Sequence, residues 1–356
     1  MRATAETGFR APNLTESAES TKFGSESVGD PRRCPQARAL ADDLRTAANR
    51  LPASDPQSTL LSARADNLTS IECLGASASV VRNNPDLKPE SSRSLNAGIV
   101  FSPSKTWRAS VDAWDIRRRN EIGLKSTVEL LNAEALQPAG TINRYPIAND
   151  PSFSAAERQK YGVTAGLLQS VVGRFENTAR THMQGVDVAG QATTNSPLGA
   201  ITLQTDTVYL STFRNWSAAR GDWGSNLAGR GGYARWRLTN SATLQHGIWE
   251  HTLQAISYSG TPLQGDLSDT TYSDQNCADA GYSPHDCKIS GYTRWNYGLR
   301  FTGWRRLTLG MHVANVFGTR KPQAAANWLQ TGGLIPPGTD DAVGRTLRLT
   351  LEWRGQ

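Results

Sequence analysis

No stretch of this 356-residue chain approaches the roughly 18 consecutive apolar residues that a membrane-spanning helix needs. That absence excludes a helical membrane protein. It does not exclude a membrane β-barrel, because strands that alternate lipid-facing and lumen-facing residues have the average hydropathy of a soluble protein. The first ten residues also lack the apolar core and cleavage site of a signal peptide, so we expect the natural start to lie upstream.

Catalytic signatures are missing as well. There is no phosphate-binding glycine loop, no G-x-S-x-G and no H-E-x-x-H, and the five histidines are scattered. We therefore expect no enzyme, no cofactor and no bound metal. The net charge of +6 comes largely from arginines spread along the chain, whereas a nucleic-acid binder usually concentrates its charge on one patch or helix. Nucleic acid is not an expected partner.

Cysteine is scarce, but its arrangement is informative. The four cysteines form two pairs, Cys277 with Cys287 and Cys34 with Cys73, and each pair brackets a polar stretch. This pattern favours two disulfides that hold loops in an oxidising compartment. A zinc site is the alternative, although no C-x-x-C occurs and only His285 lies close to a pair.

A period of two is the clearest pattern that is present. The last strand-like segment alternates four apolar residues with three polar ones: Leu347, Leu349, Leu351 and Trp353 with Arg348, Thr350 and Glu352. This alternation predicts a strand with one apolar and one polar face, and the segments 291–303 and 305–316 repeat it. Their length fits the roughly 9–11 residues of a tilted membrane strand.

The connections between such segments alternate in length. Short polar turns fall near 102–106, 195–199, 246–247 and 303–304, whereas long loops span about 13–88, 120–175, 214–230, 260–290 and 317–342. Outer-membrane barrels combine tight periplasmic turns with long extracellular loops in this way. We predict one strand ending near Gly8 and further strands at 90–103, 106–119, 178–194, 200–213, 231–244, 248–259, 291–303, 305–316 and 343–355. A short helix over 36–50 is expected inside the first loop.

The predicted fold class is therefore all-β. It is a partial transmembrane antiparallel β-barrel of about ten meandering strands with long extracellular loops. Tryptophans at strand ends, such as Trp107, Trp249 and Trp304, fit the aromatic girdle of a membrane interface.

Several short motifs occur in a fixed order along the chain. They are Gly8, Phe9, Arg10, Ala11 and Pro12; Asn84, Pro85, Leu87, Pro89 and Glu90; VDAWDIRRRNEI; Gly185-Val186-Asp187; Asn315 with Phe317; and Gly344 with Arg345. This ordered set resembles the barrel motifs of TonB-dependent outer-membrane receptors, beginning with their Gly-Phe-Arg-Ala-Pro and Asn-Pro-x-Leu-x-Pro-Glu segments. The resemblance implies that these residues are architectural.

The same resemblance implies a barrel of roughly 22 strands around a plug domain. Residues 1–356 would form the C-terminal portion of that barrel, without the plug. The location would be the outer membrane of a Gram-negative bacterium, among outer-membrane lipid. The ligand would be a nutrient such as a ferric siderophore, cobalamin or an oligosaccharide. The TonB complex would be reached only through the missing plug region, so this portion alone is not expected to transport.

One departure from the family pattern and one alternative function remain. Trp353 is followed by three residues, whereas the family usually ends on an aromatic. The alternative function is a β-rich extracellular or periplasmic carbohydrate-binding module.

Two sets of side chains are candidates for ligand contact. Five aromatics in the long loops would stack on a sugar or a siderophore, or else pack the loops together: Trp216, Trp223, Tyr272, Tyr282 and Trp328. Five arginines at inward strand positions would line the lumen: Arg235, Arg237, Arg294, Arg300 and Arg348. These would face a plug or an anionic ligand, or form a solvated salt-bridge lattice with Asp112, Asp187 and Glu352.

Overall fold

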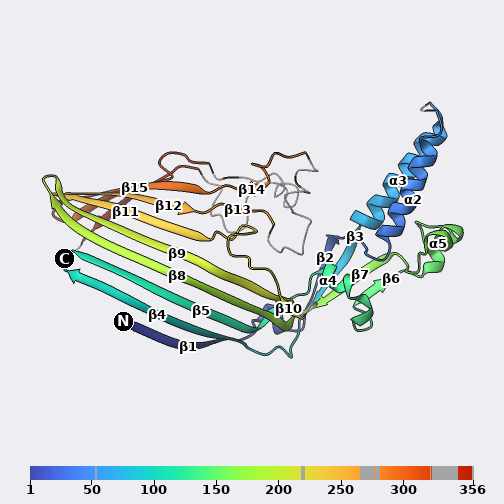
Figure 1. Ribbon diagram of the computed structural model, residues 1–356, viewed down its shortest axis with the longest axis horizontal. Coiled ribbons are helices and arrows are strands. Elements are labelled where there is room, and N and C mark those ends of the chain that lie inside the picture. Colours follow the sequence, from blue (N-terminus) through green and yellow to red (C-terminus); the bar gives the residue numbers. More distant parts are fainter. Residues whose placement is uncertain are drawn as a thin grey trace.

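A computed structural model describes the chain apart from residues 53, 218–220, 265–276, 278–280, 321, 323–343 and 355–356. Its two parts are a large curved sheet and a smaller α/β extension that projects from one end of that sheet (Figure 1). Within the described residues, none of the helices combines the length and apolar character needed to cross a bilayer.

The large sheet is antiparallel, and each strand pairs with its neighbours along the chain. Its path contains β1 (Arg2–Arg10), β4 (Glu90–Ser104), β5 (Trp107–Gly123), β8 (Glu176–Ser196), β9 (Gly199–Ser217), β11 (Trp236–His246), β12 (Trp249–Tyr258), β15 (Tyr292–Trp304), β16 (Leu307–Ala314) and β17 (Thr346–Trp353), in that order. The short β10 (Asp222–Trp223) pairs with β9 beside this path. The predicted strands are all present with shifted ends, and the predicted meander is confirmed.

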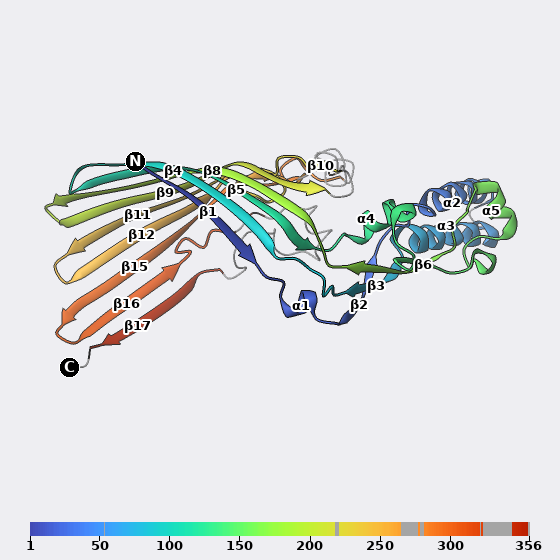
Figure 2. The same ribbon diagram turned by 90° about the horizontal axis from the view of Figure 1, so that it is seen from below.

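Short turns and long connections lie at opposite ends of this sheet. Figure 2 shows both chain termini at the end that carries the short turns. Aromatic rings gather at the same end: Phe101 contacts Trp107 with ring centroids 5.5 Å apart, and Phe301 contacts Trp249 at 4.6 Å and Trp304 at 5.3 Å. This clustering is the arrangement expected of an aromatic girdle.

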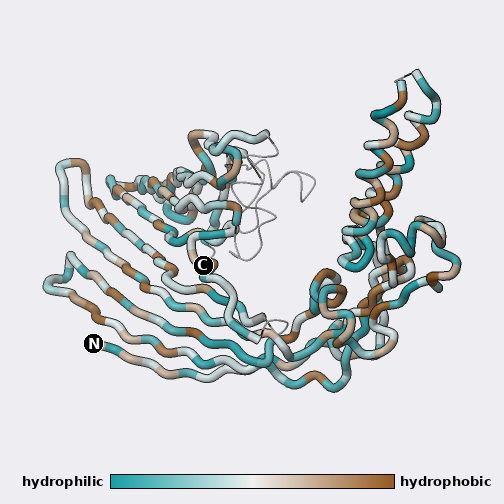
Figure 3. Tube along the Cα trace, turned by 45° about the vertical axis from the view of Figure 1, so that its right-hand side comes forward, coloured by the Kyte–Doolittle hydropathy of each residue, from teal (hydrophilic) through white to brown (hydrophobic). Residues whose placement is uncertain are grey.

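The strand register keeps like residues on one face. Leu349 lies opposite Met311, and Met311 lies opposite Leu299. Because side chains alternate along a strand, the residues between them share the other face, where Thr350 lies opposite Gly310. Figure 3 shows this alternation of apolar and polar residues along the strands. The sheet therefore has one mainly apolar face and one polar face.

The two longest predicted loops are in fact structured, which corrects the prediction. Residues 13–88 and 120–175 form the α/β extension around a four-stranded sheet of order β2 (Thr21–Ser27), β3 (Ala76–Arg82), β7 (Leu168–Arg174) and β6 (Ile142–Arg144). β3 and β7 are parallel. The helical segments are α1 (Leu14–Ser17), α2 (Cys34–Ala48), α3 (Pro56–Leu74), α4 (Thr127–Asn132) and α5 (Ala155–Tyr161), with 3-10 turns at Glu134–Leu136 and Ile147–Asn149. A separate two-stranded sheet joins β13 (Thr261–Pro262) to β14 (Lys288–Ile289).

The helical part of the extension has its own core. The predicted helix over 36–50 is confirmed as α2, which places Leu40 and Leu44 against Ala65 and Leu68 of α3. Phe153, just before α5, completes this cluster. The sequence interpretation missed α3, because its apolar residues are spread around the helix and Leu60 remains 70% exposed.

Candidate functional site

The first two family-like motifs meet at the loop end of the sheet. Arg10 and Glu90 are register partners of β1 and β4, and Arg10 Nη2 lies 2.6 Å from Glu90 Oε1. Glu90 is buried and also accepts hydrogen bonds from Arg118 and from the backbone N–H of Ile122. Glu90 therefore joins three strands where the chain leaves the sheet, which is a structural arrangement.

The remaining motif residues occupy similar junctions. Asn84 Nδ2 donates to the Phe175 carbonyl, and Leu87 is buried. Asn315 has a positive φ of 54°, and its side chain is held by the backbone of Thr319. Phe317 contacts Trp295 edge-on. Arg345 and Gly344 precede β17.

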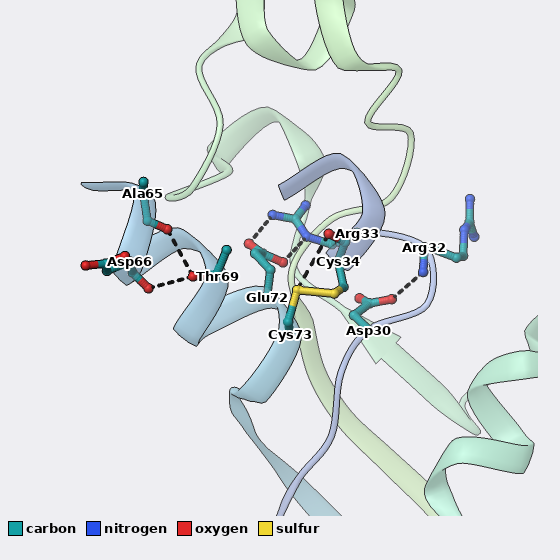
Figure 4. The surroundings of a disulfide bond; sticks show 9 residues. All are labelled: Asp30, Arg32, Arg33, Cys34, Ala65, Asp66, Thr69, Glu72 and Cys73. Carbon is teal, nitrogen blue, oxygen red and sulfur yellow. Dashed lines mark hydrogen bonds and ion pairs between the residues drawn. A yellow bond between two sulfur atoms is a disulfide. The ribbon is translucent and has the colours of Figure 1, made fainter. Parts of the chain in front are cut away.

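Both predicted disulfides are present. Cys34–Cys73 has a Cα separation of 4.9 Å, and Cys277–Cys287 has one of 5.8 Å. The first does not hold a loop as expected: it joins the first residue of α2 to the last turn of α3 (Figure 4). The second is buried against Tyr282.

A buried ion cluster lies beside the first disulfide. Arg33 directly precedes Cys34, and its side chain is fully buried. The guanidinium makes five hydrogen bonds, to Glu72, Asp150 and the Ala165 carbonyl. Figure 4 shows the pair with Glu72. All N–H donors of the guanidinium are satisfied in this way. The guanidinium also lies 5.1 Å from the Phe153 ring centroid. This single side chain joins α2, α3 and the 147–166 segment.

Burial and ion pairing shift the pKa values of this cluster in opposite directions. Burial by itself would lower the pKa of Arg33, but its hydrogen bonds to Glu72 and Asp150 outweigh burial and raise that pKa. Burial would raise the pKa of Asp150, whereas Arg33 and the N–H groups of Ser152 and Phe153 lower it. Arg33 and Asp150 are therefore ionised at neutral pH, and the role of the cluster is structural.

Two of the predicted loop aromatics lie in paired strands, Trp216 in β9 and Trp223 in β10. Trp216 and Trp223 contact each other edge-on at 5.7 Å, and the Arg180 guanidinium lies 4.9 Å from the Trp216 ring centroid. Tyr282 packs on the Cys277–Cys287 disulfide. Tyr272 and Trp328 lie outside the described residues. Their role as ligand contacts remains a prediction.

A group of arginine and tyrosine side chains is a better candidate for ligand contact than these aromatics. Arg237, Tyr258, Tyr292 and Arg294 lie on the polar face near the loop end of β11, β12 and β15. Tyr258 and Tyr292 stack at 5.7 Å with an interplanar angle of 7°, and the Arg237 guanidinium lies 5.5 Å from the Tyr258 ring centroid. The buried Nε of Arg294 has no hydrogen-bond partner among the described residues. We call these four residues the inner cluster.

The sequence predicted only part of the inner cluster. The inward position of Arg237 and Arg294 follows from period two, but their association with the two tyrosines depends on the register. The expected salt-bridge lattice is wrong for the described residues. Asp112 pairs with Arg2, and Asp187 accepts a hydrogen bond from Trp114 Nε1. Arg235 donates to the Ala228 carbonyl.

The described residues contain no group of three or more His, Cys, Asp or Glu placed to hold a metal ion. The sheet has a polar face with cationic and aromatic side chains at its loop end, and a mainly apolar face on the other side. A long-stranded meander with these two faces and an aromatic girdle is an outer-membrane β-barrel sheet.

Comparison with known proteins identifies which barrel family this is. The family model described as "TonB dependent receptor-like, beta-barrel" matches residues 1–316. The chain therefore belongs to the TonB-dependent receptor β-barrel family, an outer-membrane transporter family. The comparison with curated proteins found no match.

Solved structures show the same fold. A mutant of the ferric enterobactin receptor PfeA from Pseudomonas aeruginosa matches with a TM-score of 0.52 and 14% identity, over 99% of this chain and 37% of the receptor. The siderophore receptor PirA from Acinetobacter baumannii matches with a TM-score of 0.53 and 14% identity, over 99% of this chain and 38% of the receptor. The chain thus spans less than two fifths of the length of these receptors.

The family assignment allows a sharp prediction for β17. Leu349 lies on the apolar face, so replacing it with arginine near the bilayer midplane should cost about 2–4 kcal/mol. Thr350→Arg, one residue along on the polar face, should cost far less. Urea unfolding of the vesicle-reconstituted receptor that contains this chain would measure both. Equal losses would contradict the assignment of the apolar face to lipid.

Proposed function

We propose that the protein containing this chain imports a nutrient across the outer membrane, and that the nutrient is an anionic ferric siderophore. The observation that carries the substrate class is the inner cluster. Guanidinium groups pair with anionic oxygens, and stacked tyrosine rings with a nearby guanidinium suit a flat, electron-rich ligand. The siderophore receptors that share the fold support this choice.

We further propose that residues 1–356 supply the C-terminal strands of a larger barrel. β1 and β17 are the two edges of the large sheet. Lipid cannot hydrogen-bond the backbone groups of an open edge, so further strands must pair with both. A plug domain, through which the TonB complex would act, would also come from outside these residues. The chain by itself would not transport.

Uptake by the intact protein tests the substrate. A strain that lacks the gene should lose uptake of the cognate radiolabelled ferric siderophore, and the intact gene should restore it only where TonB is present. Cobalamin and oligosaccharide uptake serve as parallel assays. A strain that keeps siderophore uptake but loses one of the other two would overturn the substrate proposal and leave the family unaffected.

Substitutions in β15 test the inner cluster. Arg294→Gln should weaken ferric-siderophore binding about tenfold, since one charge-assisted hydrogen bond is lost. Arg300→Gln is the matched control, because it lies on the same strand and face but about 20 Å nearer the short turns. Equal binding by both variants would count against the inner cluster as the ligand contact.

A further inference from the structure

Four basic side chains lie directly opposite one another on the apolar face of the large sheet. Arg93 of β4 faces Arg117 of β5, Arg117 faces His182 of β8, and His182 faces Arg214 of β9. We call these four residues the cationic row. Like charges directly opposite one another destabilise a sheet, so such a row calls for a counter-charge.

The chain itself provides only part of that counter-charge. Asp115 lies two residues nearer the short turns than Arg117 on β5. It accepts hydrogen bonds from Arg117 Nε at 3.0 Å and from Gln184 Nε2 at 2.7 Å, and it lies 2.9 Å from His182 Nε2. Among the described residues, Arg93 and Arg214 form no ion pair. Arg119 lies two residues beyond Arg117 and faces Ser91. It also forms no ion pair with a described residue. One carboxylate therefore orients the middle of a row that carries a surplus of positive charge.

The row lies at the height where lipid headgroups begin. Along β4, Arg93 is eight residues from Phe101 of the aromatic girdle. That spacing corresponds to about 27 Å along the strand and about 20 Å along the barrel axis at a tilt of about 40°. The apolar band of an outer-membrane barrel is about 25 Å tall. The row is therefore at its upper, outer-leaflet edge.

Two hollows connect the row to the apolar surface below it. One, of about 410 Å³, is lined by Ser91, Arg93, Arg117 and Arg119 together with Asp115. The other, of about 720 Å³, continues toward the short turns. On the apolar face it is lined by Leu95, Asp115 and Gln184 near the row and then by small apolar side chains: Ala3, Ala5, Ala97, Ala113 and Val186. Leu95 and Asp115 line both hollows.

Four of the small side chains of the second hollow come from one register line. Ala3 faces Ala97, Ala97 faces Ala113, and Ala113 faces Val186. This line leaves a trough on the apolar face, four residues below the cationic row, and Leu95 and Asp115 lie between the two. A polar headgroup site thus lies above a place where an acyl chain can pack, and Leu95 lines the hollows at both.

We propose that this surface binds a phosphorylated lipid of the outer leaflet, with its phosphate on Arg93, Arg117 and Arg119 and an acyl chain in the trough. Arginine is the side chain best suited to phosphate, because its planar donors match two phosphate oxygens at once. A free anion would use the arginines but not the trough. The proposal rests on the family and the sheet register, and it is independent of which nutrient is imported.

Lipid retention by the intact receptor tests the proposal. The receptor is purified in mild detergent, stripped of lipid, and incubated with diphosphorylated lipid A or with the same lipid after enzymatic dephosphorylation. Native mass spectrometry then counts bound lipids. We expect the wild-type receptor to retain the diphosphorylated lipid and to bind its dephosphorylated form at least tenfold more weakly. This comparison needs no variant.

Variants then locate the site. Arg93→Gln with Arg117→Gln should lower retention about tenfold or more. Arg305→Gln with Arg306→Gln removes the same charge at the exposed turn between β15 and β16, and it should leave retention unchanged. Equal retention by the two double variants, or equal binding of the dephosphorylated lipid, would overturn the proposal. Displacement of the lipid by millimolar inorganic phosphate alone would show a free-anion site instead.

Discussion

Replacing Arg33 with methionine should lower the free energy of unfolding of the α/β extension by about 3–5 kcal/mol. Methionine fills similar space but leaves Glu72 and Asp150 without their cation, and both carboxylates are fully buried. Burying an unpaired charge costs far more than the ion pair contributes. The Phe153 ring would also lose the guanidinium beside it.

Hydrogen exchange of peptides from α2 and α3, measured on the intact receptor, would report this loss as local opening. Arg32→Met is the matched control. Arg32 is the preceding residue, its side chain is 45% exposed, and its ion pair with Glu134 spans 3.4 Å, so it should change stability by less than about 1 kcal/mol. If both variants exchanged at the wild-type rate, Arg33 would not hold the extension together.

A second substitution separates the charge from the packing. Combining Arg33→Met with Glu72→Met removes one of the two stranded carboxylates, so part of the lost stability should return. Buried ion pairs replaced by apolar residues of similar volume are often no less stable than the original. Recovery in the double variant would show that the unpaired charge, not the lost contacts, dominates the cost.

The strands of the large sheet were predictable because each has two different surroundings. One face of β17 carries Leu347 and Leu349 while the other carries Arg348 and Thr350, and a period of two follows directly from that difference. The strand neighbours also followed from sequence, since short turns leave an antiparallel meander as the simplest connection. Local pattern was therefore enough to predict the strands of the large sheet.

The α/β extension was not predictable in the same way. Its strands β3 and β7 are parallel and separated by roughly ninety residues, so no turn signals their pairing. Arg33 and Asp150 are 117 residues apart in the sequence. The residues around them form no pattern that predicts a buried ion pair. The inner cluster and the cationic row likewise depend on which residues the register places opposite one another. Composition and period contain no such information.

Removing the Cys34–Cys73 disulfide should destabilise the same extension by up to about 4 kcal/mol on the chain-entropy account. The bond closes a span of 39 residues that contains both long helices, and an unfolded chain released from that constraint gains entropy. The expected change in a Cys34→Ala, Cys73→Ala variant is faster exchange throughout α2 and α3. Cys277→Ala with Cys287→Ala is the control, because it opens a span of 10 residues elsewhere and should leave both helices unchanged. Because Cys34 follows Arg33 directly, the destabilisation caused by losing the disulfide and that caused by losing Arg33 should not be additive. A helix pair that exchanged as slowly without its disulfide as with it would show that the Arg33 cluster alone is sufficient.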